Sequence, residues 1–195
     1  MGRPSTISTD HILHVARQVF LEQGSGASTA IIAAQAGISE GTIYKRFDTK
    51  MSLFRAAMGL PDLPDFEDWL ARADEESAEV MLTSVLLDLM GLYRQLLPRL
   101  MMLWSSPGAD PLTLFRDSPE PPPARIVRGI REVIDLKVRS GQLAPADPDA
   151  CARMMVGSVV HYVFMELMGQ LPGGEQAYES YAQRVVANLL SGVAP

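Results

Sequence analysis

The chain has 195 residues, of which 47% are hydrophobic and 21% are charged, so it can hold a small domain of about fifty residues and a larger body. No stretch reaches the roughly 18 consecutive apolar residues of a membrane span, and the opening MGRPSTISTD lacks the apolar segment of a secretory signal. The single cysteine, Cys151, cannot form an internal disulfide. These features exclude membrane-spanning and disulfide-stabilised secreted proteins, and we expect a cytoplasmic protein.

The net charge of −6 is unevenly distributed along the chain. Residues 1–58 hold six Lys or Arg against four Asp or Glu, whereas the remainder holds 11 basic and 19 acidic residues. A mildly basic N-terminal part on an acidic body favours contact with DNA at one end only. A split of this size also arises by chance, so charge alone does not decide the question.

All long segments carry apolar residues at helical spacing, and no alternating run is joined by an Asn-Gly or Asp-Gly turn. The sequence therefore predicts an all-α protein. The first helix covers about Thr9 to Gln23 and stops at Gly24. Further helices are expected at 29–36, 39–46 and 49–58. Gly59, Pro61 and Pro64 then break the pattern and place the boundary between a head, residues 1–60, and a body, residues 61–195.

The body should begin with an amphipathic segment from Phe66 to Arg72 and continue as a long helix. We expect Asp74, Glu75 and Glu76 in the first turn of that helix, where acidic residues are favoured, and its end near Trp104 after a bend at Pro98. Residues 105–123 hold six of the fourteen prolines and predict a long, mobile loop. The last three helices are expected from Pro123 to Gly141, from Asp147 and Pro148 to Met168, and from Glu175 to Ser191.

The stretch IAAQAGISEGTIYKRF, residues 32–47, has the spacing of two short helices that cross at a sharp angle. Ala33 is small where the helices approach, and Gly37 allows the turn between them. The miniature core is filled by Ile32, Ala36, Ile38, Ile43 and Phe47. Short polar residues remain at the outer start of the second helix, and a major groove about 12 Å wide can admit them.

The segment from Ile12 to Met58 resembles the DNA-binding domain of the TetR/AcrR family of transcriptional regulators. The matching pieces are ILHVARQVFLEQG, then ST..IAAQAGISEGTIYKRF, then DTKMSLF. This resemblance covers about a quarter of the chain. It departs from the usual family form in a link one residue shorter between Gly24 and Gly37 and in the apolar Ile31, so that either Ser28 or Thr29 caps the second helix.

The resemblance, together with the geometry of the motif, assigns roles on DNA. Base-edge contacts are expected from Thr42 and Lys45, with Ser39 and Glu40 at the helix entrance. Alternatively, Glu40 only complements the helix dipole. Phosphate contacts are expected from Arg3, Ser28, Thr29, Tyr44 and Lys50. Arg46 and Arg55 are expected on a solvated face.

We find no catalytic residues, no cofactor motif and no metal site in the sequence. Cys151 has no His at helical spacing, so we expect an inert thiol. His11 and His14 lack the further ligands of a metal site. An enzyme is therefore not expected.

The body suggests a pocket for a small apolar or aromatic effector, because Met and aromatic residues recur at spacings of three or four along the long helix. The alternative for each Met is ordinary core filling, and for His161 it is a core or interface position. The expected pocket residues are Met90, Tyr93, Leu97, Met101, Trp104, Met155, His161 and Tyr162, with the 105–123 loop as a lid.

The last two helices carry more apolar surface than one small body can cover, which predicts a homodimer through a four-helix bundle. The expected interface residues are Val156, Val160, Val163, Phe164, Leu167, Tyr178, Val185 and Leu189. The sequence as a whole predicts a regulator that binds a palindromic DNA operator, most simply a repressor released by its effector. The alternative is a dimeric binding or scaffolding protein without specific operator recognition.

Overall fold

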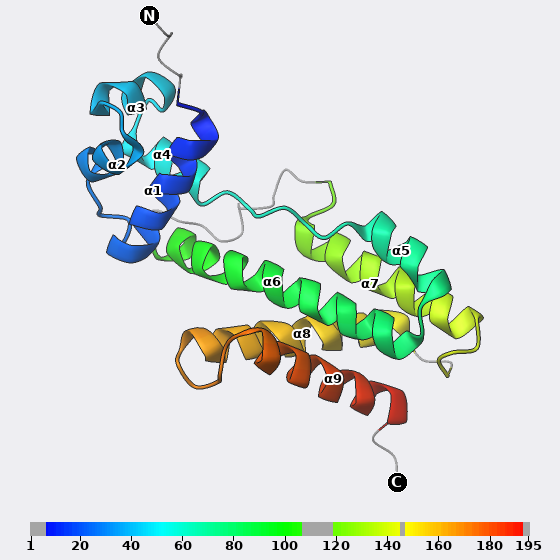
Figure 1. Ribbon diagram of the computed structural model, residues 1–195. Helices are drawn as coiled ribbons and strands as arrows, with labels where there is room; N and C mark the ends of the chain where they lie inside the picture. Colours follow the sequence, from blue (N-terminus) through cyan, green and yellow to red (C-terminus); the bar gives the residue numbers. More distant parts are fainter. Residues whose placement is uncertain (1–6, 107–118, 145–146, 193–195) are drawn as a thin grey trace, which may run out of the picture. The chain divides into compact units, whose positions relative to one another are not determined.

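The computed structural model describes residues 7–106, 119–144 and 147–192, and these ranges contain nine α-helices and no strand (Figure 1). The all-α prediction is confirmed. The chain divides into two compact units, one of residues 1–60 and 96–114 and the other of residues 61–95 and 115–195. The long helix α6 (Ala78–Ser105) therefore contributes to both units.

The first unit contains α1 (Thr9–Gln23), α2 (Thr29–Ala36), α3 (Glu40–Arg46) and α4 (Lys50–Ala57), close to the bounds predicted from the sequence. One face of α1 is apolar and buried, and it consists of Ile12, Val15, Ala16, Val19 and Phe20. Phe20 of α1 meets Phe54 of α4 edge to face, with ring centroids 5.1 Å apart, an arrangement favoured by the charge distribution of aromatic rings. These contacts build a core around α1, on which the short helices are fixed.

The C-terminal end of α6 belongs to the same unit. Met102 and Leu103 pack against the core formed by α1 to α4. Two arginines also hold the chain where it leaves α4: Arg17 Nε donates to the Ala57 carbonyl oxygen at 2.7 Å, and Arg99 Nη1 donates to the Gly59 carbonyl oxygen at 2.8 Å. The exit from the head is thereby tied to both α1 and α6.

The second unit begins with α5 (Phe66–Glu75), and here one prediction was wrong. The acidic run Asp74 to Glu76 ends α5 instead of opening the long helix, because the chain becomes extended at Glu76. The fully buried Lys137 of α7 donates to the carbonyl oxygens of Ala73 and Glu76, so a cation satisfies the C-terminal carbonyls of α5. Gln142 Oε1 accepts from the backbone N–H of Ala78 at 2.8 Å and helps to start α6.

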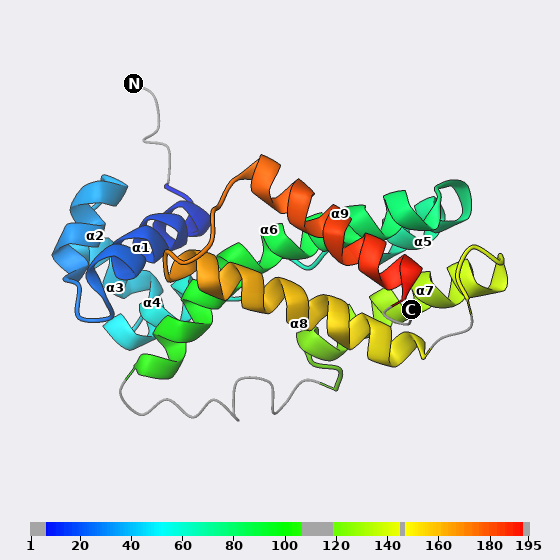
Figure 2. The same cartoon turned by 90° about the horizontal axis from the view of Figure 1, so that it is seen from below.

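The remaining helices of this unit are α7 (Pro122–Arg139), α8 (Pro148–Leu167) and α9 (Glu175–Ser191), in agreement with the sequence to within two residues. Figures 1 and 2 both show α5 beside α7 and α8 beside α9. The α5–α7 contact is close: a Cβ on Gly129 would lie 2.6 Å from Cδ1 of Phe66. Most of the predicted proline-rich loop, residues 107–118, lies outside the described residues.

By length and composition, one helix in the described ranges, α6, could cross a membrane. Half of its apolar window is buried in the structure. The apolar composition of α6 is explained by its fully buried residues, which pack against other helices. They include Met81, Leu82, Val85, Leu86, Leu89 and Met90.

Candidate nucleic-acid interface

The turn between α2 and α3 depends on one glycine. Gly37 ends α2 in the left-handed conformation, with φ of 69° and ψ of 32°. Its N–H donates to the Ala34 carbonyl at 3.2 Å, and the N–H of Ile38 donates to the Ala33 carbonyl at 3.0 Å. These bonds satisfy the last carbonyls of α2 while they redirect the chain, and they set the angle at which α3 leaves.

Serine and threonine side chains begin the short helices. Ser28 Oγ accepts from the Ala30 N–H at 3.2 Å, and Ser39 Oγ accepts from the Thr42 N–H at 3.2 Å. Thr49 Oγ1 accepts from the Ser52 N–H at 3.0 Å. Ser28 is therefore the cap of α2, which decides between the two residues left open by the sequence, and Thr29 is the first helical residue.

The two faces of the α2–α3 pair differ as the motif predicts. Ile32, Ala33, Ala36 and Ile43 are buried, and Ile38 and Phe47 pack partly against the same core. The outward side of α3 is polar and comparatively open. It presents Ser39, Glu40, Gly41, Tyr44 and Lys45, with Thr42 half-buried among them.

Three of the predicted DNA contacts form a hydrogen-bonded cluster with one another. The Thr29 hydroxyl donates to Glu40 Oε1, and its oxygen lies 3.1 Å from the hydroxyl of Tyr44. Thr29 is only 5% exposed, whereas Tyr44 is 43% exposed. The cluster joins the start of α2 to the outer face of α3, so the Thr29 side chain is already occupied within the protein.

The other predicted contacts are distributed around this face. Ser39 and Thr42 share a hydroxyl–hydroxyl hydrogen bond of 2.9 Å, Lys45 is exposed, and Lys50 is half-buried at the first residue of α4. Ser28 is exposed. Arg3 lies outside the described residues.

Arg46 was predicted on a solvated face, and this was wrong. Its Nη2 donates to the Ile7 carbonyl oxygen at 2.7 Å, and Nη1 reaches Thr9 Oγ1 at 3.5 Å. Arg46 instead fixes the segment before α1 to the end of α3. The sequence carries no local signal for this bond, because its partners are 37 and 39 residues away.

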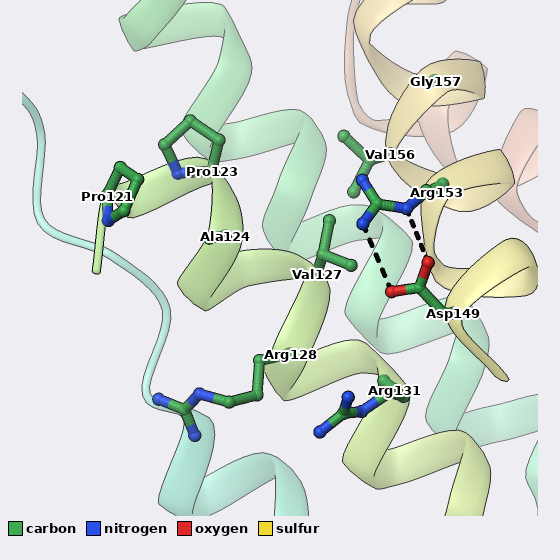
Figure 3. Close-up of a pocket in the computed structure, with 10 residues that line it drawn as sticks. All are labelled: Pro121, Pro123, Ala124, Val127, Arg128, Arg131, Asp149, Arg153, Val156 and Gly157. Carbon is green, nitrogen blue, oxygen red and sulfur yellow. Dashed lines mark hydrogen bonds and ion pairs between the residues drawn. The ribbon is translucent and has the colours of Figure 1, made fainter. Parts of the chain in front are cut away.

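A hollow of about 620 Å³ lies between α7 and α8 in the second unit. Arg131 forms no ion pair within the described residues, while Arg128 pairs with Glu120 at 2.7 Å and Arg153 pairs with Asp149 at 2.6 Å. Figure 3 shows side chains from both helices around the space. The lining combines apolar and basic groups: Pro121, Pro123, Ala124, Val127, Arg128, Arg131, Asp149, Arg153, Val156 and Gly157.

The eight residues expected around an effector do not line this hollow. Met90, Met155 and Tyr162 are buried in the second unit, and Tyr93 is nearly so. His161 is exposed on α8. In the first unit, Leu97 is half-buried, and Met101 and Trp104 are exposed.

A second hollow, of about 530 Å³, lies between α6 and α9. Tyr178 lines it and donates to Glu166 Oε1 at 2.7 Å, while Arg94 pairs with the same oxygen at 3.3 Å. Tyr178 is therefore bound within its own protomer. These contacts connect α6, α8 and α9 of the second unit.

The expected dimer residues have unequal exposure. Phe164 and Leu167 are exposed, but Val163 is fully buried inside its own protomer and has no surface to offer a partner. The remaining five are half-buried: Val156, Val160, Tyr178, Val185 and Leu189.

Neither cysteine nor histidine builds a reactive centre in the described part of the chain. Burial, and secondarily the charge of Asp147, raises the pKa of the Cys151 thiol, which keeps it in the unreactive protonated form at neutral pH. His11 and His14 are exposed on α1. Within the described residues, no group of three or more His, Cys, Asp or Glu side chains is placed to hold a metal ion.

Comparison with known proteins gives a consistent assignment for the head. The model of the family "Bacterial regulatory proteins, tetR family" matches residues 12–57. Residues of this chain are 41% identical over 63 positions to the HTH-type transcriptional repressor BepR of Brucella suis biovar 1 (strain 1330). That match spans 32% of this chain and 30% of BepR, less than a third of the relative's length. Residues 12–57 of the head thus match the tetR family.

The fold of the whole chain is similar to that of solved regulators. The FadR of Bacillus subtilis, in complex with stearoyl-CoA, is 20% identical with a TM-score of 0.65, over 96% of this chain and 100% of that one. The fatty acid degradation regulator FadR of Bacillus halodurans is 21% identical with a TM-score of 0.64, over 98% of both chains. At 20–21% sequence identity, this similarity shows a common fold and nothing more specific.

We predict that Gly37→Ala will lower the free energy of unfolding by roughly 1–2 kcal/mol, because a side chain is disfavoured at the positive φ of this turn in the head. Urea denaturation measures the change. Gly26→Ala is the matched control, since Gly26 has no positive φ and open space around a Cβ. Equal stability of the two variants would contradict the role given to the turn.

Proposed function

We propose that the protein is a homodimeric transcriptional regulator whose α3 helices read a palindromic DNA operator, and that it acts as a repressor released by an effector. The observation that carries the proposal is the exposed polar face of α3, set at a fixed angle by the Gly37 turn in a head of the tetR family. The small or short residues at its start, Ser39, Gly41 and Thr42, let a helix approach base edges in a major groove.

Affinity and specificity arise from different side chains in this proposal. Lys50, at the start of α4, supplies a positive charge beside free backbone N–H groups and suits a phosphate. Thr42 and Lys45 lie on the outer face of α3 and suit base edges. Two heads about 34–36 Å apart would place these contacts in successive major grooves of one DNA face.

We predict that Lys50→Ala will weaken binding to all DNA sequences alike and lower the slope of log K against log salt concentration by about 0.9, the share of one phosphate contact. Thr42→Ala will instead relax the preference at one base position in each half of the palindrome. The free energy of binding to the preferred DNA should become about 1–3 kcal/mol less favourable. Fluorescence anisotropy on a site selected from random DNA, at several salt concentrations, measures both effects.

Arg55→Ala is the matched control, because Arg55 is an exposed cation at the far end of the same helix, α4. It should change neither specificity nor the salt slope. If Lys50→Ala and Thr42→Ala affect selected and random DNA identically, the division of roles is wrong. If the parent protein selects no sequence at all, the rival function, a helical binding or scaffolding protein, is favoured.

The dimer proposal is supported by a row of exposed residues along α8. Met154, Gly157, His161, Phe164 and Met168 follow one another at alternating spacings of three and four, the seven-residue repeat of packed helices. Met154 is 64% exposed and Phe164 42% exposed, which is unusual for apolar side chains in line on one helix. We place the dimer interface, called the seam below, on this row. Of the interface residues expected from the sequence, Phe164 is the one that belongs to this row.

We predict that the parent protein will have twice its monomer mass of 21.3 kDa in solution, and that Phe164→Glu will make it monomeric. A charge buried without a partner at the seam costs several kcal/mol. Size-exclusion chromatography with light scattering at micromolar concentration measures the mass. The control is Val80→Glu, at an exposed apolar position on α6. A dimeric Phe164→Glu variant would move the seam elsewhere.

For the effector we propose an apolar molecule with an anionic group, held in the α7–α8 hollow (Figure 3). The proline and valine side chains suit an acyl or ring portion, and Arg131, which has no ion pair within the described residues, suits a carboxylate or phosphate. The fold relative from Bacillus subtilis is described in complex with stearoyl-CoA, which has this chemistry. Because α6 contributes to both units, a ligand that favours one arrangement of the second unit can bias the head.

We predict that acyl-CoA thioesters will bind the protein and lower its affinity for the selected DNA about 5- to 150-fold. Arg131→Ala should weaken ligand binding roughly 10- to 100-fold, since a hydrogen bond to a charged group is lost. Isothermal titration with acetyl-, octanoyl- and stearoyl-CoA measures this effect.

Arg139→Ala, an exposed arginine on the last turn of α7 outside the hollow, is the control. Unchanged binding in Arg131→Ala would place the ligand elsewhere. A protein that binds none of the three thioesters would refute the effector class and leave the DNA-binding proposal standing.

A further inference from the structure

The hydrogen atoms in the cluster of Thr29, Glu40 and Tyr44 can be assigned by counting donors. A threonine hydroxyl has one proton, and an ionised carboxylate has none. The Thr29 proton is directed to Glu40 Oε1. The 3.1 Å contact between the Thr29 and Tyr44 oxygens must therefore be made by the proton of Tyr44. The chain of donors runs from Tyr44 to Thr29 and ends on Glu40.

This direction affects what Tyr44 can offer to DNA. A phosphate oxygen only accepts hydrogen bonds, so a phenol binds it by donating its single proton. In the cluster that proton points to Thr29, and the exposed side of the Tyr44 oxygen carries lone pairs. Tyr44 is 43% exposed and can turn outward, whereas Thr29 is 5% exposed and is held between α2 and α3.

We propose that Glu40 is a positioning residue that restrains Tyr44 in the DNA-free protein. As the last acceptor of the chain, its carboxylate orients the Thr29 hydroxyl and thereby draws the Tyr44 proton away from DNA. Release of Tyr44 accompanies DNA binding, and its free-energy cost is the same for every DNA sequence. This inference rests on the DNA-binding function proposed above and replaces base reading as the role of Glu40.

The first test needs no DNA. The ¹³Cζ signal of Tyr44, recorded by NMR on protein labelled at its five tyrosines, reports whether the phenol donates a hydrogen bond. The signal should change in Glu40→Ala and in Thr29→Val, which keeps the shape of the side chain and removes the hydroxyl. It should not change in Glu22→Ala, which removes an equal charge from an exposed site on α1. An unchanged signal in Thr29→Val overturns the donor chain.

The second test uses DNA. Glu40→Ala should tighten binding to selected and random DNA alike by roughly two- to tenfold, the range of one net hydrogen bond, and Glu22→Ala should not. In a Tyr44→Phe background the gain should vanish, because no hydroxyl remains to be released. Far-ultraviolet circular dichroism checks that each variant is folded.

Two results in this test would overturn the inference. A gain that persists with Phe at position 44 would mean that Glu40 acts through charge repulsion alone. A loss of preference at one base pair in Glu40→Ala would make Glu40 a base reader. If the parent binds no DNA, the proposed function fails, and the NMR test still decides whether the donor chain exists.

Discussion

Arg99, near the end of α6, donates a hydrogen bond to the Gly59 carbonyl oxygen where the chain leaves the head helices. Together with Met102 and Leu103 it builds the end of α6 into the head core, while residues 78–95 of the same helix belong to the other unit. One continuous helix thus serves two cores. Any change in the second unit that moves α6 acts on a helix already fixed at the head. Pro98 lacks a backbone N–H, so one intrahelical hydrogen bond of α6 is missing close to the division between the units.

The head shows how one polar face can serve two requirements. Its side chains must be ordered in the free protein, because unsatisfied polar groups and mobile helix ends are costly. In the proposed function, the same groups must also remain available to phosphates and bases. Ser39 and Thr42 bond to each other, and Thr29 bonds to Glu40 and lies near Tyr44, so internal partners occupy sites that DNA would use. In the function proposed above, DNA binding would therefore exchange hydrogen-bond partners on a preformed surface.

Local signals in the sequence were sufficient for most of the fold. The periodicity of α1, its stop at Gly24, and the cap at Asp147 depend on residues within a few positions of each other, and the structure confirms all three. The break between α5 and α6 was missed because it depends on Lys137 and Gln142, more than sixty residues away. An acidic run that suits the start of a helix occurs at the end of one, where the buried Lys137 satisfies the last backbone carbonyls.

For the candidate site, as for the fold, the sequence predicted the local features but not the contacts between distant residues. The α2–α3 motif identifies Glu40 and Tyr44 as outward-facing, but not that both bond to the buried Thr29, since hydrogen bonds between side chains leave no periodic signal. For α8, an apolar helix on nearly every side, periodicity cannot distinguish the face packed in its own protomer from the open one. Val163 was therefore assigned to a surface from which the fold excludes it.

The three lysines of the chain differ in their access to solvent. Lys45 and Lys50 lie on the proposed DNA-contact face, whereas Lys137 is completely buried against the end of α5. All other basic residues except the histidines are arginines, which resist acylation. Acetylation of the folded protein at lysine would consequently fall on the head alone and remove positive charge where phosphates are expected. Lys137 would react only after α5 and α7 separate, so its modification reports opening of the body.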